Sequence, residues 1–132
     1  MKLGQIVDAY KALDEATVKE LSFDERMAVV NAMSAMRATA TDFDMFLKSL
    51  RDKFKTPNLE EIVSKIQMGK GLTEAEVSEF MVYNTPVNKA VNAEREKEIS
   101  IEVPKISRDT ILKLIGENGW KMKMMEVLDF CS

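Results

Sequence analysis

The sequence predicts a mainly α-helical fold, in which an antiparallel hairpin of long helices is covered by short helices, with one short β element near residues 98–103. Apolar residues recur at helical spacing through most of the 132 residues. Only three prolines and five glycines interrupt the chain, too few for a many-turned β fold. The only good strand pattern lies at residues 98–103. The length fits one domain, residues 1–132.

The longest helical signal covers residues 23–55. Ser22 and Glu25 form a capping box at its start. Apolar residues in its second half are spaced alternately by four and three, which gives one narrow seam, as in coiled coils. We expect this seam to be covered inside the molecule, where the long helix pairs antiparallel with the helix that begins at Thr73. The seam consists of Met36, Ala40, Phe43, Leu47, Leu50 and Phe54.

Short amphipathic segments surround this helix. Residues 2–20 predict a first helix that ends near Glu20. Pro57 opens a short helix, which ends at the glycines that follow Met68. A second capping box, Thr73 with Glu76, opens a helix that turns its apolar residues Val77, Phe80 and Met81 inward and kinks or briefly breaks at Pro86.

The last third of the chain predicts two further helices. Ser107 caps the first, with Ile106 packing on Ile111 and with Leu112 and Ile115 inward. Residues 116–119, Gly-Glu-Asn-Gly, predict a turn. The tail, residues 120–131, fits a helix better than a strand, although residues 120–124 also alternate.

Residues 98–103 predict a strand, with Ile99, Ile101 and Val103 on one face and Pro104 after it. Strand amides and carbonyls need partners. These could come from residues 120–124 or from a second chain. The strand therefore predicts a homodimer, or a protein partner bound by strand addition, through these three residues.

Four basic residues gather at the end of the long helix, where the helix dipole favours positive charge: Lys48, Arg51, Lys53 and Lys55. They could contact phosphates, which makes a nucleic-acid-associated regulator the alternative function. Duplex binding normally needs a basic excess, whereas this chain has a net charge of −3. The structural interpretation of the cluster is therefore favoured.

The chain contains no histidine, which excludes Ser-His-Asp and Cys-His nucleophile systems and histidine-based zinc sites. Glu74, Glu76 and Glu79 cluster at the start of a helix, where the dipole accounts for them without a metal. We predict a non-enzymatic protein without catalytic residues, cofactor or metal; a carboxylate site built from these three is the enzymatic alternative. The ten methionines suit either core filling or an adaptable binding surface.

No apolar run approaches the roughly 20 residues that span a bilayer. The first residues form an amphipathic helix rather than a secretory signal. The single cysteine, Cys131, cannot form an internal disulfide, which agrees with a reducing compartment. These features predict a cytoplasmic protein.

Both ends of the chain resemble a loose set of uncharacterised small phage and prophage proteins. The first 13 residues match a Met-Lys-Leu-x-x-Ile-Val-x-Ala-Tyr-Lys-Ala-Leu opening, and Val103-Pro104-Lys105-Ile106 matches a Pro-Lys-Ile element that follows an acidic segment. Residues 56–70 look like an inserted helix. The resemblance implies a phage- or mobile-element-type protein without known catalysis, and it transfers no functional residue. Together with the missing chemistry, it predicts an interaction or assembly protein.

Overall fold

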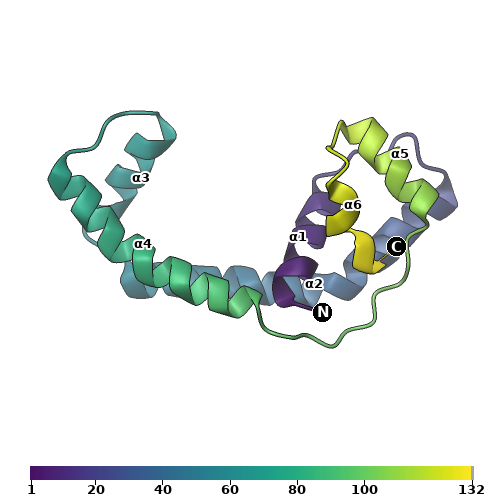
Figure 1. Ribbon diagram of the computed structural model, residues 1–132, viewed down its shortest axis with the longest axis horizontal. Coiled ribbons are helices and arrows are strands. Elements are labelled where there is room, and N and C mark those ends of the chain that lie inside the picture. Colours follow the sequence, from purple (N-terminus) through teal and green to yellow (C-terminus); the bar gives the residue numbers. More distant parts are fainter. Residues whose placement is uncertain (132) are drawn as a thin grey trace. The chain divides into compact units, whose positions relative to one another are not determined.

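A computed structural model describes residues 1–131. Within this range the chain is mainly helical, as predicted, and Figure 1 shows the order of its elements. None of the helices in this range has both the length and the apolar character needed to cross a membrane. The elements are α1 (Leu3–Asp14), α2 (Phe23–Phe54), α3 (Leu59–Gln67), α4 (Glu74–Arg95), α5 (Arg108–Asn118), α6 (Met124–Val127) and a short 3-10 helix, η1 (Asp129–Cys131).

The chain divides into two compact units, and α2 contributes residues to both. Unit 1 consists of Met1–Phe43 together with the chain from Arg95 onward, and unit 2 consists of Asp44–Glu94. The prediction of a single domain stays a prediction. Unit 1 contains one apolar core built by both of its sequence segments. Its members include Ile6, Leu13, Val29, Ala32, Met36, Ile106, Ile111, Leu114 and Leu128.

The predicted seam of α2 is its inward face. Met36, Ala40, Phe43 and Leu50 are buried, and the other two members are half-buried. By contrast, none of the residues of α4 is buried. The inward orientation predicted for Val77 and Met81 is wrong, because these side chains are 47% and 51% exposed. The antiparallel pairing of α2 with α4 stays a prediction.

Glu25 joins the start of α2 to α5. The predicted capping box is formed: the Glu25 amide donates to Ser22 Oγ at 3.2 Å, and the Ser22 amide donates to Glu25 Oε1 at 3.0 Å. The same carboxylate accepts the Thr110 hydroxyl at 3.1 Å and the Lys113 ammonium at 3.0 Å. The Ser22 amide and the Lys113 ammonium, followed by the hydroxyl groups, lower the pKa of Glu25 to about 2.

The loop between α1 and α2 is bonded to the end of α5. The Asn118 side chain accepts the Thr17 amide at 2.7 Å and donates to the Thr17 carbonyl at 3.0 Å. Glu117 accepts the Lys19 amide at 2.7 Å. The prediction that the first helix reaches Glu20 is therefore wrong. It ends at Asp14, because side chains from α5 bond the amides that a longer helix would have used.

Glycine and proline residues near the remaining helix ends were the sequence features that predicted where these helices stop. Gly69, with φ 71°, ends α3 in a Schellman motif, in which the Lys70 amide donates to the Lys65 carbonyl at 2.9 Å. The helix α4 runs through Pro86 without a break. The turn predicted at residues 116–119 is limited to Gly119, since α5 continues to Asn118.

The tail after Gly119 is helical, as the sequence pattern of residues 120–131 predicted in preference to a strand. Its helix is shorter than predicted, because α6 begins only at Met124 and is followed by η1. Contacts connect α6 with both α1 and α5, so the tail packs within unit 1. The buried Cys131 lies in η1, where burial raises the pKa of its thiol.

Two leucines of α5 test the orientation of this helix. Leu114 is fully buried, whereas Leu112, which the sequence placed inward, is 44% exposed. We expect Leu114→Ala to lower the free energy of unfolding by about 2–5 kcal/mol, because it removes buried methyl groups and leaves a cavity. The matched control Leu112→Ala should cost less than about 1 kcal/mol. Urea denaturation measures both, and equal losses would contradict the orientation.

Because the pKa of Glu25 is lowered in the folded chain, part of the free energy of unfolding should depend on pH. Its pKa is about 2 in the folded chain and about 4.3 in an unfolded one. The carboxylate therefore stabilises the fold fully above the unfolded value and loses this effect as the pH falls through the folded value. The difference in unfolding free energy between wild type and Glu25→Gln should shrink from about pH 6 to about pH 2. Glu74→Gln is the control; a difference that does not change with pH would contradict the bonding.

Candidate interaction sites

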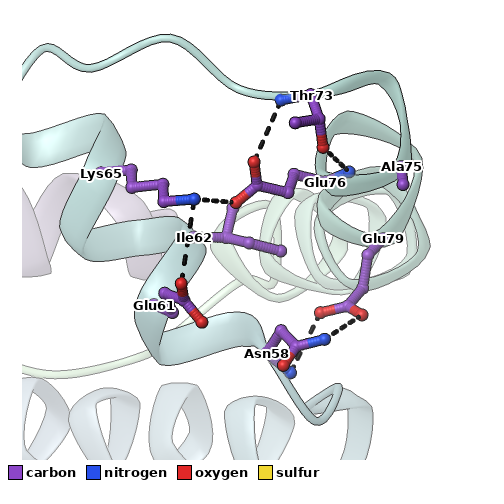
Figure 2. A pocket seen from close by; sticks show the side chains of 8 residues that line it. All are labelled: Asn58, Glu61, Ile62, Lys65, Thr73, Ala75, Glu76 and Glu79. Carbon is purple, nitrogen blue, oxygen red and sulfur yellow. Dashed lines mark hydrogen bonds and ion pairs between the residues drawn. The ribbon is translucent and has the colours of Figure 1, made fainter.

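Charged side chains of unit 2 line a cleft between α3 and α4 (Figure 2). Lys65 Nζ lies 2.6 Å from Glu76 Oε2 and 3.8 Å from Glu61 Oε1. The bond to Glu76 raises the pKa of Lys65, and Lys65 together with the Thr73 amide lowers the pKa of Glu76. The cleft has a volume of about 360 Å³ and is lined by Asn58, Glu61, Ile62, Lys65, Thr73, Ala75, Glu76 and Glu79.

The three carboxylates considered for an enzymatic site have separate structural surroundings. Glu76 completes the predicted capping box with Thr73 and binds Lys65. Glu79 accepts the Thr56 hydroxyl at 3.0 Å and the Asn58 amide at 3.1 Å, at the start of α3. Glu74 is exposed. Within residues 1–131 no group of three or more acidic or cysteine side chains could hold a metal ion.

The four basic residues of the alternative function are all exposed on the last turns of α2 and the residue after it. Lys55 forms an ion pair with Glu60 at 2.9 Å, which lowers the pKa of that carboxyl group. The ammonium of Lys53 lies 5.3 Å from the centre of the Phe54 ring. Two of the four thus have partners inside unit 2. A phosphate contact through Lys48, Arg51, Lys53 and Lys55 stays a prediction.

The strand predicted at residues 98–103 is not formed. In the described range, residues 1–131, this segment makes only an isolated antiparallel bridge between Lys2 and Glu98. The Leu3 amide donates to the Lys97 carbonyl at 2.8 Å, and the Ile99 amide donates to the Met1 carbonyl at 2.7 Å. Within the described residues, the last backbone bonds of this pairing are those between Ile99 and Met1. The other partner considered, residues 120–124, leads into α6 instead.

Ile99, Ile101 and Val103 nevertheless keep the predicted alternation. All three are half-buried and pack against the core of unit 1, whereas Ser100 and Glu102 between them are exposed. The side chains expected to bind a partner therefore contact this chain's own core. What the segment leaves accessible is its backbone and its acidic outer face.

A second apolar face of α2 was not recognised in the sequence. Phe23, Met27 and Val30 are 75%, 39% and 47% exposed. Their spacing of four and three places them on one side of the helix, away from the buried Val29 and Met36. We call these three residues the outer stripe. The spacing was visible in the sequence, but it could not show which of two apolar faces the rest of unit 1 would cover.

Half of the ten methionines lie at the surface. Core filling, one of the two uses predicted for them, applies to the fully buried Met36. The exposed members belong to several elements of the chain. They are Met27, Met45, Met68, Met81 and Met122, with exposed fractions from 39% to 68%.

Comparison with known proteins adds no residue roles to this picture. No described protein family, curated protein or solved structure matches the chain.

The capping role of Glu79 can be tested directly. We expect Glu79→Ala to destabilise unit 2 by about 0.5–2 kcal/mol, since the amide at the start of α3 loses its acceptor. Glu74→Ala, on the same helix, is the control and should have little effect. Hydrogen exchange measures the change at the Asn58 amide, which should exchange faster only in the first variant. Unchanged protection there would show that Glu79 does not cap the helix.

Proposed function

We propose that this protein is a non-enzymatic interaction protein of the phage or mobile-element type that its two ends resemble. The observation that supports this most directly is the outer stripe of α2. An exposed phenylalanine at the first position of a capped helix has an energetic cost that a binding partner would remove. An aromatic side chain buries about 150–250 Å² when covered, and each Å² of apolar surface contributes about 25 cal/mol.

The composition of the exposed apolar surface also supports binding. Methionine side chains are flexible and polarisable, so they adapt to partners of different shape. Met27 belongs to the outer stripe, and the other exposed methionines extend this property to both units. The proposal includes a cytoplasmic location and the antiparallel pairing of α2 with α4.

Changing the outer stripe tests the proposal. The variant Phe23→Ser/Met27→Gln/Val30→Thr removes its apolar surface without touching the buried face of α2. We expect wild-type protein to self-associate in sedimentation velocity, or to retain a specific protein from phage-infected or prophage-bearing cells, and we expect the variant to lose that association.

The matched control is Val77→Thr/Met81→Gln, which changes exposed apolar residues of α4 instead. It should retain the association. A wild-type protein that stays monomeric and retains no partner would contradict the proposed function. A triple variant that associates as the wild type does would contradict the role of the outer stripe.

A further inference from the structure

The pairing of Met1–Leu3 with residues 97–99 leaves an open backbone edge. In an antiparallel pair, alternate residues direct both their N–H and C=O groups to the same edge. Ile99 uses both groups on Met1, with distances of 2.7 and 3.3 Å. Ile101 and Val103 are the next alternate residues after Ile99, so their N–H and C=O groups point to the same edge. They lie in the non-helical segment between α4 and α5 (Figure 1). Within residues 1–131 their backbone groups make no backbone hydrogen bond.

A groove lies along this edge. Its volume is about 510 Å³. Because Met1 lines it together with the segment after Ser100, the groove is on the side toward which the Ile99 backbone groups point. It therefore adjoins the place where Met1 and Ile99 are bonded. The lining residues are Met1, Ile101, Glu102, Val103, Pro104 and Lys105.

The charges on the outer face of this pair follow one pattern. The Lys2 ammonium lies 2.6 Å from Glu96, and the Met1 ammonium lies 3.1 Å from Glu98. Glu96 thus pairs with the side chain of Lys2, which lies opposite Glu98 in the bridge, and Glu98 pairs with the terminal amino group of Met1. Glu102 is exposed on the same face, and no ion pair involves it within the described chain. Lys2 lies opposite Glu98 in the bridge, and a residue at the same alternation further along the edge would lie opposite Glu102, where a cation would complement its charge.

We propose that this edge binds an extended peptide segment of a partner protein, antiparallel to residues 101–103. The backbone of the peptide pairs with Ile101 and Val103. The two peptide residues opposite them are apolar, and the residue between them is Lys or Arg, facing Glu102. This is strand addition with an apolar-basic-apolar specificity. It concerns a surface separate from the outer stripe and stands whether or not that stripe binds a partner.

A second copy of this segment fits the edge less well than a peptide does. A symmetrical antiparallel pair centred on Ile101 would place Val103 of each copy opposite Ile99 of the other. The backbone groups of Ile99 that such a pair requires are already bonded to Met1. A symmetrical pair centred on Glu102 would use only Ile101 and Val103, but it would place the two Glu102 carboxylates opposite each other, which is destabilising. A peptide with a cation at that position avoids both costs.

The test is an NMR titration of the ¹⁵N-labelled full chain with the capped peptide acetyl-Gly-Val-Lys-Val-Gly-amide. We expect chemical-shift changes centred on the amides of Ile101 and Val103. The peptide with Glu in place of Lys should bind about fivefold more weakly, because one ion pair is replaced by a repulsion. The exposed-site variant Glu102→Lys should reverse this preference.

N-methylated peptides separate backbone pairing from charge attraction. Methylation of the two valine nitrogens removes the N–H groups that face the edge and should abolish binding. Methylation of the lysine nitrogen, which points away, should leave binding intact. The proposal is overturned if the Val-Lys-Val peptide causes no shifts at Ile101 and Val103 up to millimolar concentration, or if either set of controls fails to discriminate. Concentration-dependent shifts at these amides without peptide, accompanied by a dimer mass, would assign the edge to a second copy and overturn it as well.

Discussion

The fold of unit 1 depends on α5 being held against the start of α2 and the loop before it. Glu25 caps α2 and at the same time accepts hydrogen bonds from Thr110 and Lys113. Asn118 binds both backbone groups of Thr17, about one hundred positions away in the sequence. Closing so long a loop costs conformational entropy, but the cost grows only slowly with length. Burial of Ile111 and Leu114 in the shared core offsets it.

The accessible surfaces of unit 1 follow from this closure. Because the core covers the face of α2 that carries Val29 and Met36, the apolar residues on the other side of the helix stay exposed as the outer stripe. Because the chain between α4 and α5 must pass along the core, its apolar side chains turn inward in alternation. Its backbone pairs with Met1–Leu3 only as far as Ile99, which leaves the edge at Ile101 and Val103 open. One arrangement of the core thus leaves two different surfaces accessible, one of apolar side chains and one of unpaired backbone groups.

Features that the sequence predicted correctly depend on neighbouring residues. The capping boxes at Ser22 and Thr73 are short-range patterns and are formed as expected. The seam of α2 was also placed correctly, since its spacing defines one face of a helix. The end of α1 and the strand at residues 98–103 were predicted wrongly, because both depend on partners far away in the chain. The open edge beyond Ile99 likewise depends on the bonds to Met1, and the exposure of the outer stripe depends on which face the core covers.

Native-state hydrogen exchange at the Thr17 and Lys19 amides tests the closure of unit 1 most directly. Both amides belong to an irregular loop and are bonded only to side chains of α5. If the closure is as described, they exchange slowly, with the same opening free energy as the helical amide of Ile115. Exchange of Thr17 and Lys19 at the rate of an unstructured peptide, while Ile115 stays protected, would contradict it.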